Sequence, residues 1–514
     1  MSLLSAVRQG KNKPARAINF PSPIGGWNTQ DSLDQMDVKD AVELENWFPT
    51  VGRVISRKGF EEYATGLGTG NVETLAEYNA VTTRKLIAAA NNNIYDVSSA
   101  GAAVSLASGF TNNRWQWAMF TGAAPRMALV NGADAPQEYN GSTVSALTIS
   151  GSGLTVSNLI GVNIFKNRSY FWEKDSQDFW YSALNSLGGA LTKFPLGRVA
   201  GFGGNLVAMN NWTRDSGDGV DDYAVFIMST GDIIIYQGTD PSTAADWALV
   251  GVFRTGAPLG IRGSVKLGPD LIVMTKDGYV PLSKIIDTGR VTERGSVSDK
   301  INGAVKQVAD QYFSNFGWQS VLYPRGSYVL FNVPRSSTEF DQHVVNTLTG
   351  AWTKFTGMNG ACFGLYNDNL YMGGVDGTVY KCDTGTSDDG QSINLLAQTA
   401  WNYCGNRGNI KKFSAFRPVF QSESPLNFNI SLGFDFQPNY DANITQAGDI
   451  GSESAWDEAE WDVDSWAENN QFISPWSSAD GIGLNVSARV NMLTSSQYVS
   501  WYSMEYLFET GGYI

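Results

Sequence analysis

Cysteine and histidine are scarce in this chain of 514 residues. It has three cysteines, Cys362, Cys382 and Cys404, none of them in a CxxC pair, and one histidine, His343. So few and so widely spaced residues disfavour a disulfide framework and a zinc site, and we expect synthesis in a reducing cytoplasm. A Ser-His-Asp or Cys-His catalytic site would depend on His343 alone, and we expect this histidine in an exposed loop.

Long apolar runs and nucleotide-binding loops are also missing. No eighteen consecutive apolar residues occur, so we expect no transmembrane helix. Residues 1–16 carry four basic side chains but no apolar stretch of useful length, which is unlike a signal peptide; this arm either docks onto an acidic neighbour or is a disordered terminus. Neither a GxxxxGK[ST] loop nor a strand-to-helix GxGxxG unit is present. We expect no cofactor and no enzymatic activity.

Positive charge is in the minority. The chain has 36 Lys and Arg against 50 Asp and Glu, a formal net charge of −14. An acidic protein repels phosphate, which disfavours tight or sequence-specific nucleic-acid binding. The same charge is compatible with a wall past which DNA slides without sticking, or simply with solubility.

Glycine-rich turns and short apolar runs are abundant and indicate an all-β protein. From about residue 70, an apolar strand, a Gly/Asn/Asp turn and a strand with an aromatic or apolar anchor recur. The anchors are Tyr95, Tyr139, Ile235, Val280 and Val379, with weaker ones at Trp180-Tyr181 and Val344-Val345 that fill two double gaps. A period of about 45 residues is typical of a β-propeller, and six or seven blades fit residues 70–385. The alternative is a set of hairpins in sandwiches without a closed ring.

The two ends of the chain do not follow this period. We expect residues 1–69 to form an N-terminal arm and docking segment, with an extended, proline-fixed start and a short helix over residues 37–48. Residues 386–514 are expected to form a β-sandwich-like domain after a polar linker at 383–390. Five strands are predicted there, at residues 393–400, 413–420, 428–436, 484–490 and 498–508.

A tryptophan- and acid-rich insertion interrupts the C-terminal domain. Its tryptophans are spaced by five residues, which fits one face of neither a helix nor a strand. The indoles either pin a neighbouring subunit, plug the C-terminal core or form a carbohydrate platform. The candidate subunit contacts are Trp456, Trp461 and Trp466 of this insertion, together with Trp27, Trp47 and Phe48 near the N-terminus.

Carboxylates offer two further possibilities. Residues 214–222 contain a calcium-like run of oxygen donors but lack the flanking helices and closing Glu of an EF-hand, so a solvated loop is favoured over a divalent cation site. Because glycosidases use paired Asp or Glu, a carbohydrate-active or carbohydrate-binding propeller (a host-polysaccharide depolymerase or adhesin) is the alternative function, and it requires such a pair facing the propeller axis.

Three motifs together resemble the tail hub, or nozzle, proteins of short-tailed bacteriophages, also described as packaged-DNA stabilisation proteins. The first is Ile24-Gly25-Gly26-Trp27-Asn28-Thr29 with residues 41–49. The second is Trp456-Asp457 with Trp461-Asp462 and Trp466, and the third is residues 501–514. The resemblance lies at both ends of the chain; the middle matches only in its propeller-like pattern.

The resemblance implies a structural virion protein located in the tail and made in the bacterial cytoplasm. It implies a homohexameric ring below the portal and its adaptor protein, contacts with tail fibre or needle proteins, and packaged DNA held in the lumen without sequence-specific binding. A closed ring needs two different contact patches on each subunit.

Overall fold

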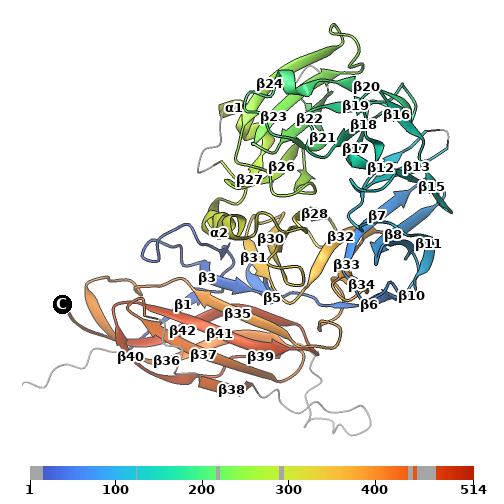
Figure 1. The fold of residues 1–514 in the computed structure, drawn as a ribbon. Helices are drawn as coiled ribbons and strands as arrows, with labels where there is room; N and C mark the ends of the chain where they lie inside the picture. The colour runs from blue at the N-terminus through green and yellow to red at the C-terminus, as the bar shows by residue number, and fades with distance from the viewer. Residues whose placement is uncertain are drawn as a thin grey trace, which may run out of the picture. The chain divides into compact units, whose positions relative to one another are not determined.

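The computed structural model describes residues 15–122, 124–215, 220–288, 295–437, 444–448 and 471–513. The chain forms two compact units: residues 58–391, and residues 1–57 together with 392–514. We refer to the first as the propeller unit and to the second as the sandwich unit, because of the sheets described below (Figure 1).

Six four-stranded sheets and one three-stranded sheet follow one another in the described part of the propeller unit. The four-stranded sheets are β7 (Val72–Asn79), β8 (Arg84–Ala90), β9 (Asn93–Asp96) and β11 (Val104–Ser108); β12 (Gln116–Phe120), β13 (Arg126–Val130), β14 (Gln137–Tyr139) and β15 (Val144–Ala146); β17 (Leu159–Phe165), β18 (Arg168–Glu173), β19 (Phe179–Tyr181) and β20 (Gly189–Phe194); β21 (Leu206–Asp215), β22 (Val220–Met228), β23 (Asp232–Gly238) and β24 (Trp247–Arg254); β28 (Gln319–Tyr323), β29 (Tyr328–Pro334), β30 (Phe340–Asn346) and β31 (Trp352–Phe355); and β32 (Gly360–Tyr366), β33 (Asn369–Gly374), β34 (Val379–Cys382) and β6 (Phe60–Thr65). Short parallel strands, β10 (Gly101–Ala102) and β16 (Ile149–Gly151), pair with β6 and β20.

The three-stranded sheet consists of β25 (Ser264–Leu267), β26 (Asp270–Thr275) and β27 (Gly278–Pro281). A helix, α1 (Leu282–Thr288), follows directly where the other sheets have a fourth strand, and its Leu282 and Ile285 join a core with β23 and β26. A second helix, α2 (Asn302–Tyr312), precedes β28 and buries Val305 and Ala309.

The sheets close into a ring. The first strands β7, β12, β17, β21, β25, β28 and β32 form the inner wall, neighbouring sheets contact one another in chain order, and β32 contacts β7. The N-terminal strand β6 pairs antiparallel with β34, so the first and last parts of the unit share one sheet. Ring closure confirms the β-propeller and excludes the alternative of unconnected sandwiches.

Each sheet is buried on both faces because strand residues alternate between two cores. In β8, Leu86, Ala88 and Ala90 join the core shared with β32–β34, whereas Ile87 and Ala89 join the core shared with β12–β14. This two-sided burial is the physical reason that the sheets pack around an axis.

The predicted period is confirmed strand by strand. The seven anchors fall in the third strands of the seven sheets: β9, β14, β19, β23, β27, β30 and β34. The predicted turns lie just before them. At the β8–β9 hairpin, Asn91 and Asn92 have φ of 48° and 61°, the left-handed pair that a two-residue turn requires.

The sandwich unit contains two sheets. One has β1 (Arg16–Pro21), β4 (Trp47–Thr50), β5 (Arg53–Ser56), β36 (Asn409–Ser422), β39 (Gln471–Ile473), β40 (Ser477–Gly483) and β42 (Val499–Tyr513). The other has β2 (Gly26–Trp27), β3 (Asp40–Glu45), β35 (Ile393–Thr399), β37 (Leu426–Phe434), β38 (Ile444–Gly448) and β41 (Val486–Thr494). Rings from β36 and β37 meet between them: Phe420 and Phe428 have centroids 5.1 Å apart. The five predicted C-terminal strands correspond to β35, β36, β37, β41 and β42.

The predicted helix over residues 37–48 is wrong: this stretch forms β3 and the start of β4. β3 pairs with β2 and with β35, some 350 residues later in the chain, and these partners satisfy its backbone hydrogen bonds. A local capping signal carries no information about such a distant partner. The unit boundaries also differ from the predicted 1–69, 70–385 and 386–514, since the N-terminal segment is divided between both units.

Candidate functional site

The end of the propeller at which the inner strands begin carries a polar network across its axis. Arg262 precedes β25, yet its guanidinium reaches the starts of β7 and β12 on the other side of the ring. Its Nη1 donates to the Glu73 carbonyl (2.8 Å), and its Nη2 donates to Thr74 Oγ1 (2.9 Å) and to the Trp115 carbonyl (2.6 Å). Arg262 therefore ties together sheets that are not neighbours and occupies the axis at this end.

The Arg262 side chain retains partial solvent contact although protein atoms surround its guanidinium. Desolvation lowers the pKa of this group below its ordinary value. Hydrogen bonds to carbonyls and a hydroxyl offset the cost of withdrawing the charge from water.

Arg114 lies beside this network. Its Nε donates to Glu73 Oε1 at 3.1 Å, and its guanidinium stacks on Phe316 with Cζ 4.4 Å from the ring centroid. The Arg114 side chain is 52% exposed. Within the described part of the chain, no residue accepts a hydrogen bond from its two terminal amino groups.

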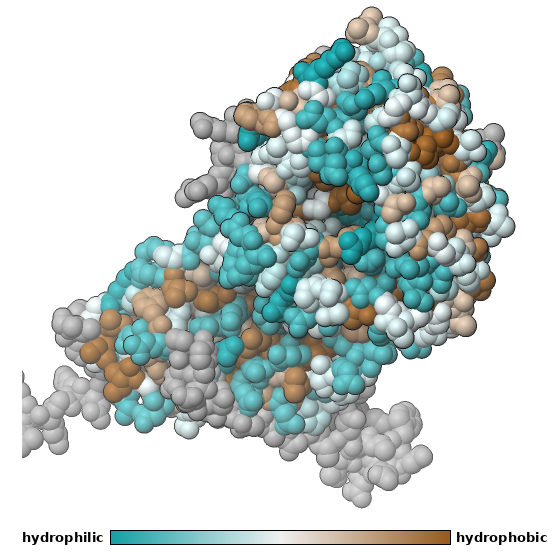
Figure 2. Space-filling model, viewed as in Figure 1, coloured by the Kyte–Doolittle hydropathy of each residue, from teal (hydrophilic) through white to brown (hydrophobic). Residues whose placement is uncertain are grey.

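A cavity of about 340 Å³ opens next to these two arginines, and we call it the axial pocket. Its lining comes from the segment between α2 and β28, from residues before β25, and from Arg114. Phe313, Phe316, Trp318 and Ile261 give this lining an aromatic and apolar surface. In Figure 2, hydrophobic and hydrophilic residues lie side by side at the middle of the propeller.

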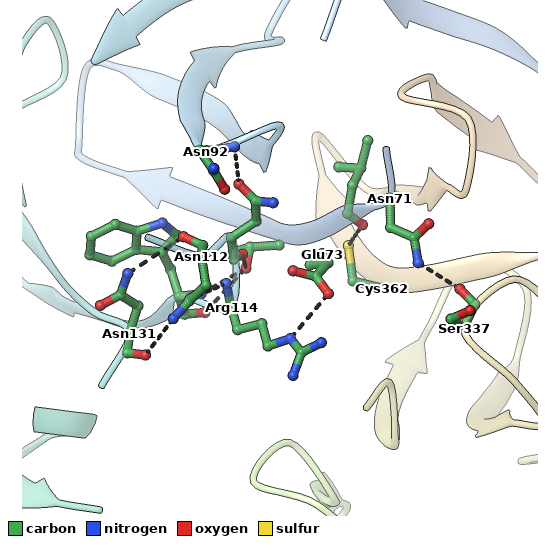
Figure 3. A network of polar contacts seen from close by, with 12 residues as sticks. Asn71, Glu73, Asn92, Asn112, Arg114, Asn131, Ser337 and Cys362 are labelled. Atoms are coloured by element: carbon green, nitrogen blue, oxygen red, sulfur yellow. Dashed lines mark hydrogen bonds and ion pairs between the residues drawn. The ribbon is translucent and has the colours of Figure 1, made fainter. Parts of the chain in front are cut away.

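Asparagines hold the loops beside Arg114 (Figure 3). The side-chain amides of Asn112 and Asn131 donate to each other's backbone carbonyls at 3.3 and 3.5 Å, and Asn112 Oδ1 accepts the Arg114 backbone N–H at 2.9 Å. Burial would raise the pKa of Asp134, but hydrogen bonds from Asn131 and Thr111 outweigh it and lower that pKa. The loop carrying Arg114 is thus fixed by local polar contacts.

The carbohydrate-active alternative requires paired carboxyl groups, and the inner strand β7 carries two candidates, Glu73 and Glu77. Glu73 is ion-paired with Arg114. Burial raises the pKa of Glu77, opposed by Arg84, but Glu77 shares a strand face with Leu75, which packs in a core between sheets. Asp368 adds to the rise in the pKa of Glu77, and the carbohydrate alternative stays a prediction.

Two of the predicted subunit contacts are core residues. Trp47 is fully buried, with its ring centroid 5.9 Å from that of Trp501, and Trp27 is 8% exposed. Phe48, on the opposite side of β4, is half-buried. Period-two alternation in β4 turns Trp47 inward, so its indole is unavailable to a neighbour. Trp456, Trp461 and Trp466 lie outside the described residues.

The two ends of the chain meet in one sheet of the sandwich unit, which contains β4 from the N-terminal motif and β42 from the C-terminal motif. β4 pairs with β5, β5 pairs with β42, and β1 pairs with β42 along six residues. Arg53 Nη1 donates to Tyr502 Oη at 2.6 Å, and the Ser22 N–H donates to the Tyr502 carbonyl at 2.9 Å. Residues nearly 450 positions apart in the sequence therefore form one continuous structure.

A group of aromatic and arginine side chains lies on the outer face of this sheet, and we call it the sandwich patch. Phe472 is 62% and Trp476 47% exposed; Phe472 contacts Tyr502, and Arg417 stacks on Trp476 with Cζ 4.9 Å from the centroid. Arg53 lies over the Tyr502 ring. The sequence does not predict this patch, because its members come from four separate segments of the chain.

The predicted position of His343 is wrong. This histidine is 2% exposed in β30, and its Nδ1 lies 2.9 Å from Tyr279 Oη. Burial, reinforced by Lys354, lowers the pKa of His343 to about 3. A neutral histidine that is buried beside the Tyr279 ring is a packing residue. Burial likewise raises the pKa of the Cys362 thiol to about 12.

Residues 216–219, in the middle of the oxygen-rich run at residues 214–222, lie outside the described residues. At its end, Asp222 contacts Lys166 and accepts a hydrogen bond from Thr213 Oγ1 at 2.9 Å. Among the described residues no group of three or more His, Cys, Asp and Glu could hold a metal ion. In the same residues no helix is long and apolar enough to cross a membrane.

No family model matches this chain, and no curated protein matches it. Solved structures with a similar arrangement include the computationally designed Ika8 protein, at 10% identity and a TM-score of 0.36 over 63% of this chain and 99% of that one. The WD40 β-propeller domain of Doa1 has 12% identity and a TM-score of 0.39 over 63% of this chain and 96% of that one. The β-propeller domain of Myceliophteria thermophila Cps50 (Swd1) has 11% identity and a TM-score of 0.39 over 61% of this chain and 96% of that one.

Proposed function

We propose that this chain is a structural tail hub, or nozzle, protein of a short-tailed bacteriophage. In this role six copies form a ring below the portal and its adaptor, retain packaged DNA and give it a conduit on ejection. The carrying observation is that both motifs of the resemblance lie in the sandwich unit: β4 and β42 belong to one of its sheets, linked through β5, and β2 and β3 belong to the other. The resemblance thus falls on a single structural unit.

The blocked propeller axis supports a conduit formed between copies. Arg262 spans the axis at one end of the ring, so DNA has no open path through a single propeller there. A lumen surrounded by several copies avoids this obstacle. Six copies at −14 each would carry −84, which repels the DNA backbone and favours sliding over sticking.

The sandwich patch supplies a contact surface for such a ring. Exposed Trp, Tyr, Phe and Arg side chains are the types enriched at the centres of protein–protein interfaces. Phe472 and Trp476 expose more than half and nearly half of their surface in a single copy, and Arg53 and Arg417 are held against neighbouring rings. This patch replaces Trp27 and Trp47 as our candidate contact.

The test is the oligomeric state of the purified full-length protein. We expect sixfold particles by native mass spectrometry and electron microscopy, alone or after mixing with the adaptor protein. Trp476→Ala should shift the particles toward monomers, whereas the control Leu348→Ala, which removes a side chain that is 79% exposed on the propeller, should not. Strictly monomeric wild-type protein under both conditions contradicts the proposal.

A further inference from the structure

The axial pocket is a positively charged site on a strongly acidic chain. The charged residues of its lining are Arg114 and Arg262, and the ammonium of Lys276 stacks on the lining residue Phe313 with Nζ 4.2 Å from the ring centroid. Glu73, which pairs with Arg114, supplies the one negative charge described in the axial network. Three cations against one anion leave a surplus of positive charge at the pocket.

The guanidinium of Arg114 is positioned to bind a ligand at this pocket. Its Nε is engaged by Glu73 and its plane rests on Phe316, so the side chain is held in place. Its two terminal amino groups have no partner among the described residues and remain solvent-accessible. A planar guanidinium held in this way matches the two oxygens of a carboxylate.

The rest of the lining favours a polypeptide over a free anion. Phe313, Phe316, Trp318 and Ile261 offer an apolar and aromatic surface beside the guanidinium. A ligand that fills about 340 Å³ there needs a carboxylate and a neighbouring aromatic side chain.

We propose that the axial pocket binds the acidic tryptophan segment, residues 456–466, of a second copy of this chain. That segment has five Asp and Glu residues, no Lys or Arg, and three tryptophans. Its composition complements the pocket in both charge and aromatic character: one carboxylate binds the Arg114 fork while an adjacent indole packs on the aromatic lining. The inference rests on the proposed function because the ring supplies the second copy, and it makes the contact head-to-tail, as a closed ring requires.

The probe is a synthetic fluorescent peptide of residues 454–468, titrated by fluorescence polarisation. The receptor is the full-length chain carrying D457N, E458Q, E460Q, D462N and D464N, so that its own segment does not compete. We expect saturable binding that Arg114→Ala weakens about 10- to 100-fold, as expected for losing a charge-assisted bidentate contact. Arg114→Lys should weaken peptide binding less than Arg114→Ala does, because lysine keeps the positive charge but lacks the paired amino groups of the guanidinium.

The matched control is Arg407→Ala. Arg407 is also exposed, also stacks on an aromatic ring (Tyr403, 4.5 Å) and also pairs with an acid (Asp34, 2.9 Å), but it lies in the sandwich unit. Its loss should leave peptide affinity unchanged. The inference is overturned if the Arg114→Ala and Arg407→Ala proteins bind the peptide with equal affinity. It is also overturned if a peptide with all its acids changed to amides binds as tightly as the original peptide. Peptide binding is read on separate copies, so a failure there is distinguishable from a failure of ring formation.

Discussion

Replacing Trp47 by alanine decides between two views of this residue, a surface contact and a core residue. The Trp47 side chain is fully buried and packs against Trp501, whose side chain is also fully buried. Removing a buried Trp typically costs about 3–5 kcal/mol, from lost apolar burial and from the cavity that remains. We therefore expect Trp47→Ala to lower the free energy of unfolding of the sandwich unit by about that amount.

Hydrogen–deuterium exchange with mass spectrometry is the suitable assay, because two units need not unfold in one step. Backbone amides in β36 and β42 should lose protection, while amides in the propeller strand β13 serve as the internal reference. Leu493→Ala, which removes a side chain that is 65% exposed on the same unit, is the control and should cost under about 0.5 kcal/mol. A Trp47→Ala effect no larger than that of Leu493→Ala refutes the core assignment and restores Trp47 as a contact candidate.

Three further predictions concern the propeller unit. Gly59→Ala should destabilise this unit by about 1–3 kcal/mol in thermal or chemical unfolding, because a Cβ at this position would lie 1.8 Å from the Ser387 carbonyl oxygen. The control is Gly70→Ala, which should be neutral because a Cβ there would have no atom within 4 Å. Equal effects of the two changes would contradict the close packing beside β6. The pKa of His343 is lowered to about 3 in the folded chain, whereas the pKa in the unfolded chain is near 6.5. The stability that the neutral histidine contributes is therefore complete above pH 6.5 and is lost as pH falls toward 3, by about 1.4 kcal/mol per pH unit. The melting temperature of the wild type should fall more steeply over this range than that of His343→Gln, and parallel curves would contradict the prediction. Finally, purified wild type should release no sugars from surface glycans of the host, and cleavage that a single Asp→Asn or Glu→Gln change abolishes would favour the carbohydrate-active alternative.

The propeller could be predicted from the sequence because its signals are local. A hairpin turn such as that at Asn91 and Asn92 needs residues that tolerate left-handed backbone, and the strand after it needs a buried anchor such as Tyr95. Both requirements are met within about ten residues of chain, and left-handed turns recur at Gly231 before β23 and at Gly377 before β34. The same holds for Phe428 and Ile430, whose alternation marked a half-buried strand and whose side chains are buried.

The candidate sites could not be predicted in this way, because they depend on partners far apart in the chain. Arg262 is unremarkable in its own segment and becomes the axial residue only when the closed ring brings β7 and β12 within its reach. Trp47 stood out by its residue type, but the side chain that buries it, Trp501, lies in β42 at the other end of the chain.

By itself the sequence determined that this protein repeats antiparallel sheets at a fixed interval, which favours a ring, since turn chemistry and apolar anchors act over a few residues. Tertiary structure alone decided which strand closes the ring, that both termini build one sandwich, and which arginines and aromatic rings meet at the axis and on the sandwich patch. Those outcomes follow from packing and hydrogen bonding between segments hundreds of residues apart, for which no local pattern carries a signal.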